Sequence, residues 1–453
     1  MEEVLAKIVH HLTKTQFDDL PEAVIDHTKK FILDSFGVAI AGASAPGCKE
    51  IMELLRSWGG KPEATLLGYR EKVPSPSAAL GNSVMMHALD FDDTLDESAL
   101  HAHVTVLPAA LAVAESIGGI SGKDLINAVT LGVDLVCRLG LATRRPLSWV
   151  RTATCGSFGA AAASGKILRL SQEEMWNALG IVYSQTSGNA QCLIDGGLVK
   201  RMQPGFSAKA GVLSAFLAQR GITGAKDVLE GPYGFFNLYE RGDYDQERLY
   251  DELGNRFDGM KLSIKPYPSC RMTHASIDAA IAVRENDKLN PFEIEEVVVR
   301  VSRMVFDMVG GPFVIRENPQ VDAQFSIPYN VAVGIIKGDV FLKDFDESSI
   351  RDPRVLELSK KIRVEADPTL PERDMGTADI QVKTRNAIFR EKVDQVKGNP
   401  LNPMDMNDCV KKFMKCVEYC ENSALREGRR LILDRLFDLE NLGDVSALMR
   451  WFE

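Results

Sequence analysis

The sequence lacks most of the short motifs by which common enzyme classes are recognised. It has no phosphate-binding P-loop, no dinucleotide-binding glycine fingerprint and no G-x-S-x-G nucleophile elbow. It also has no H-E-x-x-H zinc motif, and its eight cysteines include no CxxC pair. We therefore expect no nucleotide cofactor. We expect the scattered cysteines to be buried thiols of a reducing compartment, since a disulfide frame is not typical of such a long chain.

Other absences restrict the partners and the location. No apolar run reaches the length of a membrane span without charge or glycine, and the acidic N-terminus lacks a signal-peptide pattern. The formal net charge is −10 and no basic run occurs, which argues against nucleic-acid binding. With 453 residues, of which 45% are hydrophobic and 26% charged, we expect a soluble, cytoplasmic protein of two or three domains without a membrane partner.

Most of the chain has the pattern of a large helical domain. Before residue 262, apolar residues recur at helical spacing in about ten segments, and several of these are apolar on more than one face. Residues 156–168 are almost all small, which is typical of a helix that a neighbouring backbone approaches closely. A short strand-like piece occurs at 64–68. The predicted helices are 5–12, 24–39, 50–58, 75–87, 108–117, 121–141, 156–168, 171–182 and 206–219.

The pattern changes after about residue 262. Alternating residues predict strands at 295–302 and 362–367 and a hairpin of 378–384 with 388–393, among helices at 273–283, 327–336 and 348–361. A Pro-, Gly- and Asn-rich linker at 397–404 precedes an amphipathic helix at 409–417. We therefore predict a mainly α protein. Its large all-helical domain would be formed by both chain ends, residues 1–265 plus 396–453, with an inserted α+β lid domain at 266–395.

The stretch from His87 to His103 concentrates titratable groups between apolar helices. It holds three of the seven histidines and five acidic residues. Such a cluster is a candidate for acid–base chemistry or a metal. On a continued helix, His87, Asp90 and Thr94 would share one face. Asp90 lies between apolar neighbours, so its carboxylate must be paired or functional. We interpret three of the other four carboxylates as helix-end or capping residues, namely Asp92, Asp96 and Glu97.

Two other interpretations of this stretch stay open. His101 and His103 precede an apolar helix, and either could simply cap it. A metal site formed by His87, Asp90, His101 and His103 is conceivable. The spacing matches no zincin-type pattern, however, so we predict no metal.

Cationic and phenolic side chains occur in three further apolar settings. Lys200 opens K-R-M-Q-P-G, Lys265 and Arg271 lie in K-P-Y-P-S-C-R-M-T-H, and Tyr329 ends F-S-I-P-Y. Taken alone, each lysine is typical of a snorkelling side chain, and the tyrosine of a structural one. Together, two lysines, an arginine and a helix N-terminus make a natural pocket for carboxylates.

In this order, these segments resemble the MmgE/PrpD family, whose members include 2-methylcitrate dehydratase, cis-aconitate decarboxylase and iminodisuccinate epimerase. The resemblance covers nearly the whole chain. It rests on H-A-L-D-F-D-D-T at 87–94, H-A-H-V-T-V-L-P-A at 101–109, T-C-G-S-F-G-A-A-A-A at 154–163, K-P-Y-P-S-C-R-M-T-H-A-S-I-D-A at 265–279, F-S-I-P-Y at 325–329 and G-N-P-L-N-P-M at 398–404.

The resemblance implies a large all-helical domain, an α+β lid, a homodimer, and neither a metal nor an organic cofactor. It implies a small di- or tricarboxylate as substrate. The family's active-site set falls on Asp90, Thr94, His101, Lys200, Lys265 and Tyr329. We predict that Asp90, His101, Lys200, Lys265 and Tyr329 are catalytic. We predict that the substrate is bound by Thr94, Arg151, Gln203 and Arg271.

Three departures from the family pattern bear on the reaction. Val150 stands where the family often has a histidine, and Gln203 stands where it often has another. The Thr94–His101 stretch is one residue longer than the decarboxylase spacing. We therefore rank dehydration of a 2-methylcitrate-like hydroxy acid first. Epimerisation of an iminodisuccinate-like dicarboxylate comes second and cis-aconitate-type decarboxylation third. A non-catalytic helical binding protein stays open as an alternative from another class.

Overall fold

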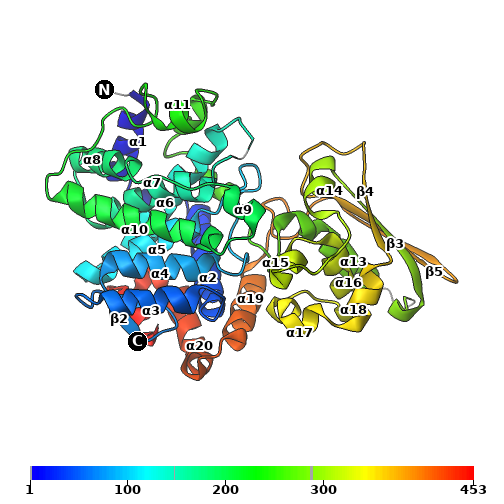
Figure 1. Ribbon diagram of the computed structural model, residues 1–453. Coiled ribbons are helices and arrows are strands. Elements are labelled where there is room, and N and C mark those ends of the chain that lie inside the picture. The colour runs from blue at the N-terminus through cyan, green and yellow to red at the C-terminus, as the bar shows by residue number, and fades with distance from the viewer. Residues whose placement is uncertain (1–2, 147, 286–288, 453) are drawn as a thin grey trace. The chain divides into compact units, whose positions relative to one another are not determined.

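A computed structural model describes residues 3–146, 148–285 and 289–452 (Figure 1). The chain forms two compact units, which are described separately here. The first consists of Met1–Leu262 with Asp405–Glu453, and the second of Ser263–Met404. The boundary between Leu262 and Ser263 lies close to the one expected after residue 265. The boundary between Met404 and Asp405 follows the 397–404 linker. This linker was expected in the first unit and lies in the second.

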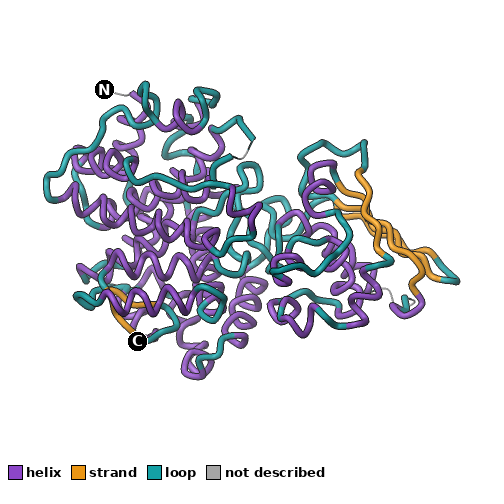
Figure 2. The backbone as a smooth tube through the Cα atoms, in the orientation of Figure 1, coloured by secondary structure: helices purple, strands orange, loops and turns teal. Residues whose placement is uncertain are grey.

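Among the described residues of the first unit, the regular secondary structure is helical apart from one short hairpin, and loops join the helices, as Figure 2 shows. The hairpin pairs β1 (Ala64–Leu66) with β2 (Glu71–Val73). The prediction of a mainly α protein is confirmed. The helices are α1 (Glu3–Lys14), α2 (Glu22–Gly42), α3 (Cys48–Trp58), α4 (Ser75–His87), α5 (His103–Ile117), α6 (Gly122–Ala142), α7 (Arg151–Ile167), α8 (Gln172–Tyr183), α9 (Gln191–Asp195), α10 (Val199–Gln219), α11 (Phe235–Tyr239), α12 (Glu247–Tyr250), α19 (Met406–Tyr419), α20 (Ser423–Phe437) and α21 (Ser446–Met449).

Small residues let the central helices of this unit pack closely. α10 packs against α4, α5, α7 and α8, and α7 also packs against α5 and α6. A Cβ atom added at Gly159 of α7 would lie 2.2 Å from Val136 Cγ2 and 2.7 Å from the carbonyl oxygen of Gly132. One added at Gly211 of α10 would lie 2.6 Å from the carbonyl carbon of Ala160. The predicted close approach around the small-residue helix is confirmed.

Two helices begin earlier than predicted. α5 begins at His103 and α10 at Val199, so Pro108 and Pro204 lie inside these helices. Proline removes one backbone hydrogen bond, and this had favoured a start at or after each proline. At α5, the first turn is stabilised instead by a carboxylate from outside the helix, described below. The earlier start of α10 places Lys200 in its first turn.

The second unit combines a sheet with helices. The strand order is β4-β3-β5-β6, with β3 (Ile294–Val301) parallel to β4 (Ile362–Ala366) and antiparallel to β5 (Ala378–Thr384), which pairs in turn with β6 (Ile388–Val393). The predicted hairpin is therefore confirmed. α13 packs on β5 and β6, and α16 packs on α13 and β4. The helices are α13 (His274–Arg284), α14 (Arg303–Val309), α15 (Pro319–Gln324), α16 (Ile327–Lys337), α17 (Glu347–Ile350) and α18 (Pro353–Ser359).

The prediction of a single helix at 348–361 is wrong, because this segment forms two helices. α17 ends at Ile350 and α18 begins at Pro353. The residue before a proline is kept out of the helical conformation, and the proline itself suits a first turn. Asp352 caps α18 by accepting a hydrogen bond from the backbone N–H of Arg354 at 2.9 Å.

One helix among the described residues, α6, is long and apolar enough to cross a membrane by length and composition. Of its apolar window, 94% is buried inside the protein. The helix therefore has the burial expected of a core helix in a folded domain.

Glycines inside two helices should respond oppositely to replacement by alanine. Gly159→Ala should lower the free energy of unfolding by about 1–3 kcal/mol, because the added methyl group overlaps Val136 and the Gly132 carbonyl. Gly428→Ala in α20 is the matched control, since its nearest neighbour would be Trp451 Cε3 at 3.9 Å. This change should raise the free energy of unfolding by about 0.5–1 kcal/mol. Urea unfolding measures both; stabilisation by Gly159→Ala would contradict the packing described here.

Candidate active site

The chain leaves α4 directly after His87 and reaches Asp90 in a left-handed conformation. Ala88 closes the helix by donating to the carbonyl of Met85, and Asp90 has a φ of +54°. The prediction that His87, Asp90 and Thr94 share one helix face is therefore wrong. A residue with a side chain rarely adopts this conformation, and aspartate tolerates it better than most. Such backbone conformations cluster at functional sites.

The loop that follows folds back on itself. The backbone N–H of Leu95 donates to the carbonyl of Leu100 at 2.8 Å, and that of Ser98 donates to the carbonyl of Leu95 at 3.1 Å. Ala99 lies at the reversal of the chain and has a left-handed φ of +51°. This closure returns residues 101–103 to residues 92 and 93, and Thr94 is buried at the start of the turn.

Asp92 binds two histidine rings through one carboxylate oxygen. Its Oδ2 lies 2.7 Å from His87 Nδ1 and 3.2 Å from His101 Nδ1. The ring centroids are 4.9 Å apart, at an interplanar angle of 63°. His101 Nδ1 also contacts the carbonyl oxygen of Asp93. Since both partners of His101 Nδ1 are acceptors, we assign the proton of the neutral ring to Nδ1, which leaves the lone pair on Nε2.

The neighbouring carboxylate has the capping role that we had given to Asp92. Asp93 Oδ2 accepts from the backbone N–H of Ala102 at 2.9 Å, and Asp93 Oδ1 accepts from that of His103 at 3.3 Å. These groups form the N-terminus of α5, where negative charge is favoured. The sequence could not distinguish two adjacent aspartates, and the interpretation of Asp92 as a cap is corrected. His103 stacks on Phe31, with ring centroids 5.0 Å apart, and supports the loop from behind.

His87 is held neutral beneath the loop. Burial, as the main cause, and the charge of Lys200 lower its pKa to about 4, although Asp92 acts in the opposite direction. The buried ring is therefore a neutral hydrogen-bond donor to Asp92 near pH 7. Because His101 is the more exposed ring of the pair, it is the better placed to move a proton.

Lys200 brings a cation to the same cluster. Its ammonium lies 3.1 Å from Asp90 Oδ1. The Lys200 side chain is 24% exposed and that of Asp90 11%, so the pair is partly accessible. An ammonium has three donor positions, and one of these is used by Asp90. The structure thus brings together three predicted residues, Asp90, His101 and Lys200, with His87 and Asp92.

Two residues predicted to bind substrate instead form hydrogen bonds with backbone groups of the protein. The Arg151 guanidinium donates to the carbonyls of Ser98 at 3.3 Å and Arg145 at 2.5 Å. The Gln203 amide accepts from the backbone N–H of Asn189 at 2.9 Å and donates to its carbonyl at 3.2 Å. Both side chains therefore stabilise loops in this structure, and no feature of the sequence indicates these partners. Val150, which replaces a family histidine, is buried at the start of α7.

The remaining predicted residues belong to the second unit. The Tyr329 hydroxyl donates to the carbonyl of Asp344, and burial, as the main cause, together with the Asp344 charge raises the pKa of Tyr329. The ring lies in the hydrophobic core of that unit. Arg271 donates to the carbonyl of Lys397 at 3.1 Å, and Lys265 is buried. The functional roles assigned to Lys265, Arg271 and Tyr329 stay predictions.

A buried ion pair next to the loop was not predicted from the sequence. Lys412 of α19 lies 2.6 Å from Asp34 Oδ1 of α2, and it donates to the carbonyl of Phe91 at 2.8 Å. A signal was present, because Asp34 interrupts the apolar run F-I-L-D-S-F. Lys412 in turn lies on the buried face that α19 forms with Cys409, Phe413 and Cys416.

The atoms that could bind a metal ion are already joined by hydrogen bonds. Among the described residues, His87, Asp92 and His101 place one potential ligand atom each within 4.8 Å of one another. This set differs from the one considered from sequence, because Asp92 takes the place of Asp90 and His103 is not part of it. The two Nδ1 atoms lie 2.7 and 3.2 Å from one oxygen, which is typical of N–H···O contacts, whereas a metal ion would need a lone pair on each of these nitrogens. We interpret the cluster as a proton-transfer network.

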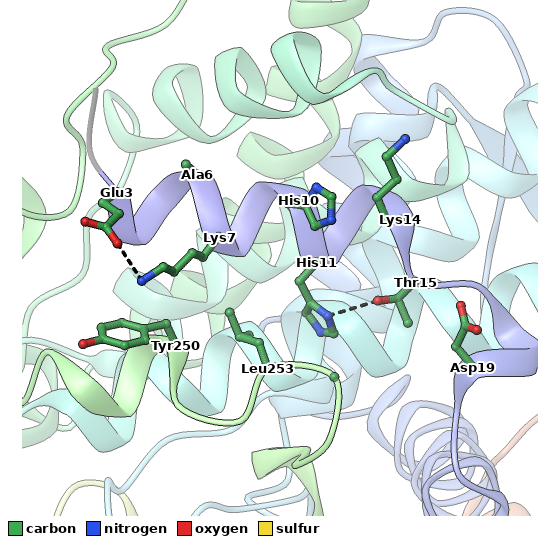
Figure 3. Close-up of a pocket in the computed structure, with 11 residues that line it drawn as sticks. Glu3, Ala6, Lys7, His10, His11, Lys14, Thr15, Asp19, Tyr250 and Leu253 are labelled. Carbon is green, nitrogen blue, oxygen red and sulfur yellow. Dashed lines mark hydrogen bonds and ion pairs between the residues drawn. The ribbon is translucent and has the colours of Figure 1, made fainter.

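A cavity of about 720 Å³ lies elsewhere in the first unit, between α1 and residues 250–254 (Figure 3). The described residues that line it include none of those predicted to be functional. His11 projects into it from α1, with Nδ1 3.0 Å from Thr15 Oγ1. Burial, as the main cause, and the charges of Arg138, Lys166 and His10 lower the pKa of His11 to about 4.

Comparisons with known proteins agree on one family. The family model described as the MmgE/PrpD N-terminal domain matches residues 5–247, and that of the MmgE/PrpD C-terminal domain matches residues 267–438. A cis-aconitate decarboxylase of Aspergillus terreus is 30% identical over 98% of this chain and 95% of that protein. The cis-aconitate decarboxylase of Homo sapiens is 28% identical over 99% of this chain and 94% of that protein. The 2-methylcitrate dehydratase of Escherichia coli (strain K12) is 22% identical over 79% of this chain and 75% of that protein. The activities in these names are lyase activities.

The neutral His11 ring should make stability depend on pH. Its pKa of about 4 in the folded protein lies below the value of about 6.5 in an unfolded chain. The unfolded chain therefore binds more protons between these values, so stability is complete above pH 6.5 and declines as pH falls towards 4. His11→Gln keeps a partner for Thr15 and removes the titration. Chemical denaturation should show a pH dependence weaker by up to about 1.4 kcal/mol per pH unit in this range. An unchanged slope would contradict the assignment, and above pH 7 the two proteins should have equal slopes.

If the cluster is a proton-transfer network, removal of metal should have no effect. Dialysis against EDTA should leave the melting temperature unchanged, and elemental analysis of the purified protein should show no stoichiometric zinc. Asp92→Asn serves as the control, since it would remove a ligand from any real site. Stoichiometric zinc in the unaltered protein that is lost in Asp92→Asn would contradict our interpretation.

Proposed function

Because this chain belongs to the MmgE/PrpD family, we propose that it is a cofactor-independent lyase acting next to a carboxylate of a small tricarboxylate. The observation that carries the proposal is the His101–Asp92 pair beside Lys200 and Asp90. The pair supplies one proton-transfer group, and the lysine supplies a cation for a substrate carboxylate or for the charge that develops on the neighbouring carbon.

Within this class, we propose decarboxylation of a cis-aconitate-like acid as the reaction. Its support is the extent of the similarity, since the decarboxylases named above match nearly the full length of this chain. The sequence alone had ranked this reaction third. The reaction also requires few protein groups. The bond to one carboxylate breaks, carbon dioxide leaves, and the electron pair shifts through the double bond. One proton is then added to a carbon beside another carboxylate.

In this reaction the His101 ring would act in its protonated form. Nδ1–H remains directed at Asp92, and Nε2–H delivers the proton to carbon. The Asp92 carboxylate stabilises the imidazolium, as the acidic member of a catalytic triad does. Lys200 would hold a substrate carboxylate and stabilise the carbanion, while Asp90 orients the ammonium at 3.1 Å.

Dehydration of a 2-methylcitrate-like hydroxy acid is the second candidate, and one observation favours it. The neutral His101 ring has its lone pair on Nε2, as a base needs for removing a proton beside a carboxylate. Dehydration also requires an acid for the departing hydroxide. The Lys200 ammonium would have to provide this proton or receive help from another group.

A proton and carbon NMR assay in D₂O separates these reactions. The protein is incubated with cis-aconitate, citrate and 2-methylcitrate. Release of carbon dioxide from cis-aconitate, with one deuterium beside a remaining carboxylate, is the expected result. An alkene formed from a hydroxy acid would show dehydration instead. Deuterium exchange without a product would indicate epimerase chemistry, and inertness towards all three acids would contradict the proposed lyase.

Two substitutions test the assigned roles in the same assay. His101→Gln should lower kcat by about 10²–10⁴-fold, because it removes the proton-transfer group. Lys200→Met should lower kcat/KM by about 100-fold or more, because it removes the cation. His10→Gln on the exposed side of α1 and Lys209→Met further along α10 are the matched controls, and both should retain turnover. Full turnover by His101→Gln in folded protein would exclude the role given to that ring.

A further inference from the structure

A buried ammonium lies directly behind the active-site loop. Lys412 is on the inward face of α19, and its side chain is 4% exposed. A buried ammonium is costly unless it is paired and hydrogen-bonded. Lys412 obtains its countercharge from Asp34, whose side chain is 1% exposed. Together these residues join α19 to α2, which come from the two ends of the chain.

Lys412 also makes two contacts with one residue of the loop, Phe91. Its Nζ donates to the carbonyl oxygen of Phe91 at 2.8 Å and lies 3.9 Å from the centre of the Phe91 ring. The hydrogen bond fixes the carbonyl, and the cation–π contact fixes the side chain. Phe91 lies between the two carboxylates, Asp90 and Asp92, that contact Lys200 and the histidine rings.

The carbonyl of Phe91 belongs to the peptide unit shared with Asp92. A peptide unit is planar, so holding its oxygen restricts ψ of Phe91 and φ of Asp92 together. A rotation of this unit would displace the Asp92 carboxylate, which has to reach two Nδ1 atoms at 2.7 and 3.2 Å. It would also disturb Asp90, which holds a φ of +54° immediately before Phe91.

The charges around Lys412 form a coupled group. Burial, as the main cause, raises the pKa of Asp34 to about 6, and the charges of Asp92 and Asp93 contribute in the same direction. Lys412 opposes this shift. Lys412 and the loop carboxylates Asp92 and Asp93 therefore act on Asp34 in opposite directions.

We propose that Lys412 is a positioning residue of the active site, holding the Phe91–Asp92 peptide so that Asp92 orients His101 and Asp90 meets Lys200. The kinetic part of this inference rests on the proposed function. The structural part concerns the His101 ring alone and does not require a known substrate.

The test compares two variants that differ in whether the side chain at position 412 carries a hydrogen-bonding amide. Asp34→Asn is introduced in both, so that neither contains an unpaired buried carboxylate. Lys412→Gln then retains an N–H group for the Phe91 carbonyl, whereas Lys412→Met retains a similar length without a donor. Thermal melting establishes that both double variants are folded, and all further comparisons are made between these two.

With cis-aconitate as the substrate, the Asp34→Asn/Lys412→Met variant should have a kcat at least about tenfold below that of the Lys412→Gln variant. Small misplacements of catalytic groups have effects of this size. KM should differ less than kcat, because the Lys200 ammonium remains in place. Equal kcat values in the two folded variants would overturn the positioning role, since a lysine that only stabilises the fold would affect melting alone.

Nitrogen-15 NMR of the histidine side chains gives a readout that is independent of substrate. With the unaltered protein and Lys412→Gln, we expect the His101 signal of a neutral ring protonated at Nδ1. With Lys412→Met, we expect a mixture of the two neutral tautomers. Identical His101 signals in both variants would overturn the proposal even if no substrate is turned over. Conversely, an inert unaltered protein with the expected tautomer change would contradict the proposed function and leave the positioning role supported.

Discussion

The arrangement of the first unit depends on one constraint, the burial of several carboxylates within a few residues of the chain. Counted as whole residues, Asp90, Asp92 and Asp93 are all at most 8% exposed, and Asp34 is 2% exposed. Each has a different kind of partner: an ammonium at Asp90, two imidazole rings at Asp92, a helix N-terminus at Asp93 and a buried ammonium at Asp34. Removing one partner of a buried ion pair typically costs about 3–5 kcal/mol. The elements that carry these partners are therefore held in place around the loop.

The close packing of the helices brings these partners to the buried carboxylates. α4 carries His87, α10 carries Lys200 and α5 presents its N-terminal N–H groups to Asp93. These helices approach one another through glycine contacts such as that of Gly205, where a Cβ atom would lie 2.8 Å from the carbonyl oxygen of Leu80. A larger residue would separate α10 from α4 and move Lys200 away from Asp90. The small residues of the core therefore determine whether the charged residues of the loop can reach their partners.

The sequence predicted the helical unit, the hairpin of the α+β unit and the cluster around His87 to His103, because these depend on periodicity and local composition. It did not distinguish Asp92 from Asp93, since adjacent aspartates have the same local chemistry and differ only in where the returning loop places them. It did not anticipate the protein partners of Arg151 and Gln203, which come from Ser98, Arg145 and Asn189.

The remaining contacts were not predicted because their partners lie far apart in the sequence. The bond from Lys412 to Phe91 spans 321 positions, and no local pattern encodes it. What a sequence can show is the anomaly at each end of the neighbouring Asp34–Lys412 ion pair, a charged residue on an apolar helix face. The two anomalies at Asp34 and Lys412 have opposite sign, which is the pattern expected of buried partners. The same reasoning applied to Arg138 would have found Asp134, one helical turn away at 2.7 Å.

The two candidate reactions make opposite demands on one atom, His101 Nε2. Decarboxylation requires a proton there, whereas dehydration requires a lone pair. The partners at Nδ1 are compatible with both, because Nδ1 stays protonated in the imidazolium and in the assigned neutral tautomer. The contacts at Nδ1 therefore orient the ring for either reaction, and the choice between the two reactions depends on what the substrate presents to Nε2.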